Sequence, residues 1–133
     1  RALRHVITKV TDEGLVIEVF DLPEMPLFEG LTATPSQVTK DIAAMIAEVL
    51  TIASNKLAVN GFVRSFPITL IENPAWAMSA SRAQAMRVLL QEAGVDSDKM
   101  ARIGGFADRK SVTANPMAIR NNRLEVVLLR RNR

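Results

Sequence analysis

The stretch of sequence that decides the fold is Trp76-Ala77-Met78-Ser79-Ala80-Ser81-Arg82-Ala83, which predicts the opening of an amphipathic helix. Apolar residues follow it at helical spacing, namely Ala83, Met86, Leu90 and Ala93. Gly94 then ends the run. Ser79 stands where an N-cap hydroxyl would accept backbone N–H groups, and Arg82 occupies the place that a capping box gives to Glu or Gln. A guanidinium beside free backbone N–H groups suits a bound carboxylate or phosphate, so Arg82 is either part of an anion site or a solvated surface arginine.

The composition fits one folded domain that covers residues 1–133. The chain has 133 residues, of which 48% are hydrophobic, enough for a single core. No apolar run approaches the roughly 20 residues that span a bilayer, and no signal-peptide pattern is present. Because the first residue is Arg, we expect an internal fragment or a processed chain whose parent carries a membrane segment outside it.

The residue types argue against catalysis. Cysteine is absent and His5 is the single histidine, so thiol chemistry is excluded and a Ser-His-Asp or histidine metal site would have to use His5. No metal-ligand cluster, Gly-rich phosphate loop or nucleophile–base pair is visible. We therefore expect no enzyme activity, no cofactor and no metal.

Charge is unevenly distributed along the chain. Residues 1–50 hold four Lys and Arg against eight Asp and Glu, whereas residues 51–133 hold thirteen against six. A basic second half indicates an anionic partner. Nucleic acid is disfavoured, because the aromatic fraction is only 5% and basic residues cluster only at the C-terminal end.

Outward from the deciding stretch, β-branched runs alternate with helical patterns. Strands are predicted over residues 5–10, 15–20, 57–63, 101–106 and 124–129, and a further helix is predicted from a capping box at Thr34-Pro35-Ser36-Gln37 to about Ala53. Alternation in 15–20 puts Val16, Glu18 and Phe20 on one face and Leu15, Ile17 and Val19 on the other, and we expect one of these faces to be only partly buried. The order β-β-α-β-α-β-β predicts an α+β sandwich, a mixed sheet with helices packed on one face.

Three motifs in this order resemble the OmpA-like peptidoglycan-binding domain, most closely its version in MotB-type flagellar stator proteins. The family's Leu-Ser-x-x-Arg-Ala helix start stands here as Met78-Ser79-Ala80-Ser81-Arg82-Ala83, preceded by the Trp76 that is typical of MotB. Gly105-Phe106-Ala107-Asp108 resembles a second motif, and Asn121-Asn122-Arg123-Leu124-Glu125-Val126 resembles a third.

The resemblance implies a non-catalytic cell-wall anchor. Such a domain would grip the diaminopimelate-containing stem peptide of peptidoglycan, with Arg82 pairing with a stem carboxylate. It would be the periplasmic domain of an inner-membrane protein, form a homodimer, and meet a MotA-like stator partner through the membrane segment. The ligand-binding residues that the resemblance implies are Arg82, Ser79, Arg64, Phe62, Asn121 and Asp108.

The sequence departs from the family pattern at the end of the 57–63 strand. Gly-His-Thr-Asp is expected there, and its aspartate would hold the ligand's ammonium group, but the chain reads Gly61-Phe62-Val63-Arg64. Either wall binding is weak or altered, or another acid such as Glu72 or Asp108 supplies the carboxylate, or Arg64 turns to solvent. The alternatives to a stator anchor are an OmpA- or Pal-type envelope anchor and a degenerate domain that serves in dimerisation or docking.

Overall fold

The computed structural model describes residues 2–66 and 74–130. Within these residues the strands are β1 (Val6–Thr11), β2 (Gly14–Phe20), β3 (Leu57–Phe62), β4 (Met100–Gly105) and β5 (Arg123–Leu129). The α-helices are α1 (Gln37–Leu50) and α2 (Ala75–Glu92), and short 3-10 turns form η1 (Ala2–His5), η2 (Ser97–Lys99) and η3 (Ile119–Asn121). The predicted order of strands and helices is confirmed, with boundaries that mostly differ by one or two residues.

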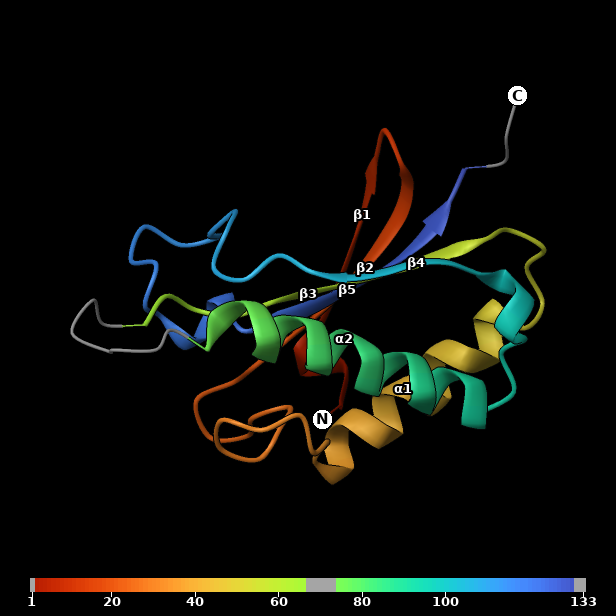
Figure 1. Ribbon diagram of the computed structural model, residues 1–133. Coiled ribbons are helices and arrows are strands. Elements are labelled where there is room, and N and C mark those ends of the chain that lie inside the picture. The colour runs from red at the N-terminus through yellow and green to blue at the C-terminus, as the bar shows by residue number, and fades with distance from the viewer. Residues whose placement is uncertain (1, 67–73, 131–133) are drawn as a thin grey trace.

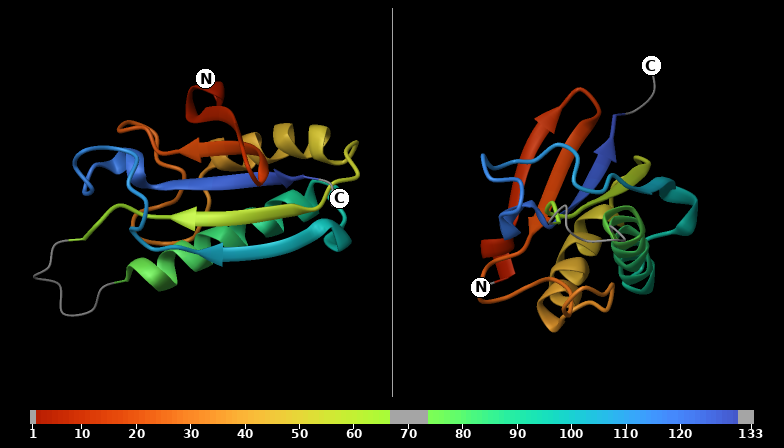
Figure 2. Two further views of the ribbon diagram at one scale, coloured as in Figure 1. Left: turned by 90° about the horizontal axis from the view of Figure 1, so that it is seen from above. Right: turned by 60° about the vertical axis from the view of Figure 1, so that its left-hand side comes forward.

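The strands form one mixed sheet in the order β1-β2-β5-β3-β4. Neighbouring strands are antiparallel except β3 and β4, which are parallel because α2 connects them as a crossover. Figure 1 shows both helices beneath the sheet, and the end-on view in Figure 2 shows the two layers. The predicted α+β sandwich with helices on one face is therefore confirmed. No helix among the described residues is long and apolar enough to cross a bilayer.

The β1–β2 hairpin depends on Gly14. Its φ of +144° is a conformation that residues with a side chain rarely adopt, and a Cβ there would lie 2.1 Å from the Leu128 carbonyl oxygen of β5. Gly14 thus permits both the turn and the close approach of the hairpin to β5.

The main core lies between the sheet and the two helices. Its fully buried members include Val19, Leu27, Ile42, Leu50, Leu57, Val59, Met86, Leu90, Leu124 and Val126. They come from the inward-facing side of the strands and from one stripe of each helix, as amphipathic periodicity predicts.

Helix α1 begins later and ends earlier than predicted. Ser36, not Thr34, is its N-cap, and Pro35 forms a β-bridge with Phe28 instead of opening the helix. The Ser36 hydroxyl donates to the carbonyl oxygens of Pro26 and Leu27, so it fastens the preceding loop to the helix start. The predicted capping box is therefore wrong, because the helix begins two residues later and the Ser36 hydroxyl bonds to the preceding loop instead of capping it.

The face of the sheet opposite the helices is also covered at β2. Val16, Glu18 and Phe20 are all buried, so the prediction of a partly buried face is wrong. Arg120 of η3 lies across this face, with its Cζ 3.6 Å from the centroid of the Phe20 ring and its Nη1 2.6 Å from Glu18 Oε2. The long β4–β5 connection thus covers this face of β2.

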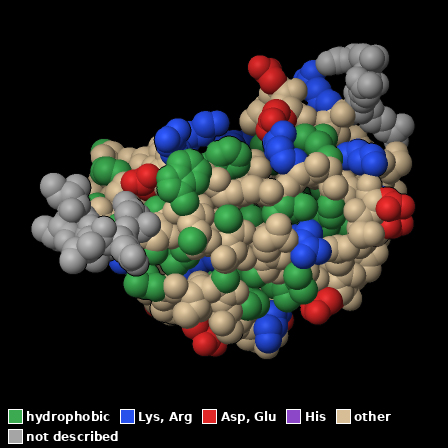
Figure 3. Space-filling view, in the orientation of Figure 1, with side chains coloured by type: hydrophobic (Ala, Val, Ile, Leu, Met, Phe, Trp, Pro, Cys, Tyr) green, Lys and Arg blue, Asp and Glu red, His purple; other side chains and the backbone are tan. Residues whose placement is uncertain are grey.

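On the side seen in Figure 1, lysine and arginine side chains lie mostly over the upper half, above α2 (Figure 3).

Candidate functional site

The deciding stretch forms the first two turns of α2, but its cap differs from the prediction. Pro74 is the N-cap residue, and Ser79 lies in the second turn with its side chain fully buried. The Ser79 hydroxyl donates to the Trp76 carbonyl oxygen at 3.1 Å and accepts from the Ala107 N–H at 2.9 Å. Ser79 therefore joins α2 to the chain after β4 instead of capping the helix, and the N-cap prediction is wrong.

Two glycines let α2 lie directly on the sheet at this point. A Cβ on Gly61 would lie 2.1 Å from the Ser79 carbonyl oxygen, and one on Gly105 would lie 2.3 Å from the Ala80 nitrogen. Because no side chain fits there, the helix backbone rests on the ends of β3 and β4. This contact sets where Arg82 emerges, one turn further along α2.

Arg82 is buried and fastened to the loop between β2 and α1. Its Nε donates to the Thr32 carbonyl oxygen at 2.8 Å, its Nη2 donates to the Gly30 carbonyl oxygen at 3.0 Å, and its Cζ lies 4.9 Å from the centroid of the Phe28 ring. The exposed fraction of the residue is 5%. The guanidinium thus meets loop carbonyls and a ring face and does not lie beside free N–H groups of a helix start, so the local reason first offered for an anion at Arg82 is wrong.

A pocket of about 200 Å³ nevertheless brings Arg82 and Arg64 together. Both arginines line it, although they come from α2 and from the segment after β3. The remaining lining residues are Asp21, Leu22, Pro23, Pro26, Phe28, Gly30, Leu31, Phe66, Met78, Ile119 and Asn122. Arg64 is half-buried, and its Nη1 donates to the Met117 carbonyl oxygen at 3.3 Å in an exposed hydrogen bond.

Asp21 supplies the carboxylate of this pocket. Its Oδ1 accepts from the Leu27 N–H at 2.8 Å, and its Oδ2 accepts from Asn122 Nδ2 at 3.0 Å. The Asn122 Oδ1 in turn accepts from the Arg64 N–H at 2.8 Å. Asn122 therefore joins the carboxylate to the backbone of the strand end that carries Arg64.

Burial shifts the pKa values of both Asp21 and Arg82. Burial raises the pKa of Asp21 above its ordinary value, opposed by the Leu27 and Asn122 hydrogen bonds and by the charges of Arg82 and His5. Burial lowers the pKa of Arg82, opposed by the charge of Asp21. Two guanidinium groups facing one carboxylate leave this pocket with an excess of positive charge, which favours an anionic group in a ligand.

The other predicted ligand residues lie outside the lining of the pocket. Phe62 is buried with its ring stacked on Phe106, the centroids 5.2 Å apart. Asp108 accepts from the Ser65 hydroxyl at 2.8 Å, and Ser79 is enclosed as described. Glu72, the other acid considered, lies outside the described residues.

Asn121 holds the loop before β5. Its Oδ1 accepts from the Val112 N–H at 2.7 Å, and its Nδ2 donates to the Thr113 hydroxyl and to the carbonyl oxygens of Asn115 and Pro116. With all of these bonds made inside the protein, Asn121 shapes the connection that ends at the pocket and does not face a ligand there.

Asp21 and Asn122 are pocket residues that were not predicted from the sequence. Asp21 stands in a proline-punctuated stretch where acids are common on surfaces, and nothing local marks it as buried. Its position directly after β2 was the available signal. Because β2 and β3 both run antiparallel to the β5 strand between them, Asp21 and Arg64 follow strands that end at the same edge of the sheet. Among the described residues, no group of three His, Asp or Glu side chains could hold a metal ion.

The chain is similar in sequence to flagellar motility proteins. No protein-family model matches the chain. Motility protein B of Escherichia coli K12 is 36% identical over 110 residues, which cover 80% of this chain and 36% of that protein. The putative flagellar export/assembly protein LafU of E. coli O44:H18 is 26% identical over 122 residues, which cover 91% of this chain and 40% of that protein. The chain thus spans less than half the length of these relatives.

Solved structures share the fold. The periplasmic domain of Helicobacter pylori MotB matches with a TM-score of 0.78 and 18% identity, covering 93% of this chain and 81% of that one. The cell wall anchor of the T6SS from Pseudomonas aeruginosa matches with a TM-score of 0.74 and 23% identity over 96% and 90% of the two chains. The OmpA-like domain of FopA1 from Francisella tularensis matches with a TM-score of 0.70 and 18% identity over 94% and 81% of the two chains. The predicted OmpA-like fold is confirmed.

Proposed function

We propose that this chain, which is homologous to part of Motility protein B and has the fold of MotB periplasmic domains, is a non-catalytic module that binds the stem peptide of peptidoglycan and anchors a flagellar stator to the cell wall. The homology supports the stator setting. The structural likeness to a protein described as a cell wall anchor supports the anchoring role.

The observation that carries the proposal is the meeting of Arg64, Arg82 and Asp21 in one pocket. A stem peptide with a diaminopimelate residue offers carboxylates and an ammonium group close together. Arginine is suited to such carboxylates, because its planar donors can bind both oxygens at once. The two arginines supply cationic donors, and Asp21 supplies an acceptor.

Arg82 is the orienting residue in this proposal. The bonds to Gly30 and Thr32 use Nη2 and Nε, and Nη1 makes no hydrogen bond to any residue in the described ranges 2–66 and 74–130. Fixing the guanidinium in this way removes side-chain freedom before a ligand arrives, which reduces the entropy lost on binding.

Asp21 replaces the acid that the family pattern would place at Arg64. Each of its carboxylate oxygens accepts one hydrogen bond from the protein, and a carboxylate oxygen can accept a second. A ligand ammonium group in the pocket would meet Asp21 from the solvent side. Arg64 then changes the site from one carboxylate and one arginine to one carboxylate and two arginines, so we expect a stem with a free second carboxylate to bind better than an amidated one.

The setting of the whole protein is part of the same proposal. The domain would act in the periplasm as part of an inner-membrane protein, pair with a second copy of itself, and assemble with a MotA-like subunit through a membrane segment outside this chain. Wall binding by the domain does not depend on those steps and can be tested separately.

Co-sedimentation with isolated peptidoglycan tests the proposal. We expect the wild-type domain to pellet with sacculi, and Arg64→Ala and Arg82→Lys to pellet at least tenfold more weakly. Arg87→Ala is the matched control, because Arg87 lies on the same helix, does not line the pocket, and bonds to Gln84 and Gln91. Failure of the wild type to pellet would contradict the anchor, and equal pelleting of all four proteins would contradict the site.

A second candidate function has one specific observation in its favour. The loop carbonyls already occupy Arg82, as they would in a domain that no longer binds wall and serves only for dimerisation or docking. Such a domain would form a dimer in sedimentation velocity and show no affinity for diaminopimelate-containing stems.

A further inference from the structure

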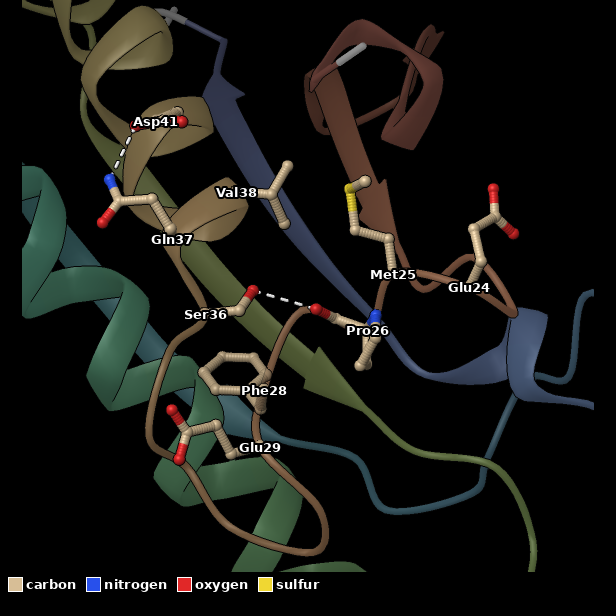
Figure 4. A pocket seen from close by; sticks show the side chains of 9 residues that line it. All are labelled: Glu24, Met25, Pro26, Phe28, Glu29, Ser36, Gln37, Val38 and Asp41. Carbon is tan, nitrogen blue, oxygen red and sulfur yellow. Dashed lines mark hydrogen bonds between the residues drawn. The ribbon is translucent and has the colours of Figure 1, made fainter.

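A second hollow, separate from the arginine-lined pocket, lies between the β2–α1 loop and the start of α1. It has a volume of about 470 Å³, and its lining is mostly apolar, with Met25, Pro26, Phe28 and Val38 at its centre. Figure 4 shows the Phe28 ring and the side chains of Met25 and Val38 around this space. The Ser36–Pro26 hydrogen bond ties its two walls together at 2.9 Å. We call this hollow the α1 groove.

The apolar surface continues along α1. Met45 and Val49 on the helix and Ile52 just after it are 40%, 60% and 87% exposed. At 3.6 residues per turn, Val38, Met45 and Val49 fall within an arc of about 40° on one side of the helix axis, and Ile52 follows two residues after the end of α1. The core uses a neighbouring arc instead, through Ile42 and Ile46.

Acidic side chains border this surface. Glu24, Glu29 and Asp41 stand around the α1 groove, as Figure 4 shows, and Glu48 lies two turns beyond Asp41 on the same flank of α1. Glu24 is paired with Arg4 at 2.8 Å. Within the described residues, Glu29, Asp41 and Glu48 have no ion-pair partner. The surface is therefore an apolar strip with unneutralised negative charge along its edge.

We propose that the α1 groove and the strip Met45–Val49–Ile52 form a docking surface for an amphipathic helix of another protein whose apolar face is bordered by Lys and Arg. From Val38 to Ile52 the strip is about 21 Å long, which matches about four turns of a partner helix. A large apolar side chain of that helix enters the groove, and its basic residues meet Glu29, Asp41 and Glu48. The acidic border selects a cationic partner, and the apolar strip supplies the buried area.

Charge argues against a second copy of this chain as the occupant. In an antiparallel two-fold pairing of α1 with α1, the flank that carries Asp41 and Glu48 would face the same flank of the other copy. Four carboxylates would then be brought together without a cation from either helix, which is repulsive. An antiparallel pairing of α1 with α1 is therefore disfavoured as the occupant of this surface.

Fluorescence anisotropy with a labelled 14-residue helical peptide of Leu and Lys in amphipathic order tests the proposal. We expect saturable binding to the wild type, with tenfold or greater weakening in Asp41→Lys/Glu48→Lys and in Val49→Asn/Ile52→Asn. These positions are exposed, so the fold is retained, and a circular dichroism melt of each variant checks this. Glu92→Lys, at the exposed end of α2, is the matched charge control and should bind as the wild type does.

Several results would overturn the proposal. They are absence of saturable binding, equal binding of a Leu/Glu peptide of the same pattern, and binding that none of the α1 variants weakens. Sedimentation velocity of the wild type and Val49→Asn/Ile52→Asn is a further test. If these substitutions convert a wild-type dimer to a monomer, a second copy of the chain covers the strip and the proposal of a cationic partner is wrong.

Discussion

Two buried arginines, Arg82 and Arg123, are held by the same means on opposite faces of the sheet. Arg123 is 4% exposed, its Cζ lies 4.0 Å from the centroid of the Phe62 ring, and its Nη2 donates to the Lys110 carbonyl oxygen at 2.7 Å. Arg82 combines the same elements, a ring face and loop carbonyls, with Phe28, Gly30 and Thr32. Burial lowers the pKa of both groups. In each case the guanidinium fixes a long loop to the sheet–helix body.

The two arginines differ in whether a ligand could reach the guanidinium group. Arg82 lines a pocket, whereas Arg123 is enclosed with Glu18, whose carboxylate also pairs with Arg120. Burial and a lowered pKa therefore do not mark a binding arginine in this fold, since both groups share them. What separates a candidate ligand contact from a structural clamp is the space in front of the guanidinium, together with Asp21 and Arg64 around it.

The largest expected effect comes from replacing Arg123, the enclosed arginine of the two. Arg123→Met keeps apolar bulk over Phe62 but leaves the Lys110 carbonyl and part of the charge of Glu18 without a partner. We expect a loss of about 3 kcal/mol in the free energy of unfolding by urea titration. Because Arg123 does not line the pocket and lies on the opposite face of the sheet from Arg82, the folded fraction should still pellet with peptidoglycan. A loss of pelleting by folded Arg123→Met would contradict the division into clamp and ligand contact.

Asn121 and Asn122 are adjacent in sequence but serve different regions. Asn121 holds the loop before β5, whereas Asn122 lies at the pocket. Asn121→Ala removes the bonds that hold residues 112–116 and should cost about 2 kcal/mol without changing wall binding. Asn122→Ala should cost about 1 to 2 kcal/mol and also weaken wall binding, because Asn122 positions both Asp21 and the Arg64 backbone. Parallel urea titration and co-sedimentation of the two variants measure this. Equal weakening of wall binding in both would remove the distinction.

A smaller effect is expected when the charge of Arg82 is kept and its shape is changed. Arg82→Lys retains a cation near Phe28 but cannot reach the Gly30 and Thr32 carbonyls in the same planar arrangement. We expect stability to fall by about 1 kcal/mol and affinity for sacculi to fall about tenfold, equivalent to about 1.4 kcal/mol. If affinity fell only as much as the folded fraction did, Arg82 would be a clamp like Arg123.

The sequence predicted the order of elements because the periodic signals are local. Strand alternation, the helical spacing after Trp76 and the glycine at Gly14 each depend on neighbours within a few residues. The motif resemblance also singled out Arg82 and Arg64, which the structure brings into one pocket.

The sequence could not predict which polar groups meet, because those contacts span long stretches of chain. Arg82 bonds to carbonyls 50 and 52 residues away, and Asn122 reaches Asp21 across 101 residues. The hydroxyl of Ser79 matched an N-cap pattern, yet the N–H of Ala107 uses it. The exposure of the apolar strip on α1 could not be predicted for a related reason, since periodicity identifies an apolar arc but not how much of it the sheet covers.

The smallest expected effect is a pH dependence that belongs to the pocket. Burial raises the pKa of Asp21 above 3.8, so between its ordinary and its raised pKa the folded state binds more protons than the unfolded state. Stability contributed by this group is therefore highest at low pH, falls as pH rises through the raised pKa, and is flat above it. Urea titrations of wild type and Asp21→Asn across this range should give a difference in unfolding free energy that shifts in favour of the variant as pH rises.

A bound ligand ammonium would favour the ionised carboxylate of Asp21 and reduce this pH-dependent difference, whereas a ligand that only contacts the arginines would leave it in place. The same titration with and without a soluble stem peptide thus distinguishes a pocket that uses its carboxylate from one in which Asp21, like Glu18, only balances an arginine.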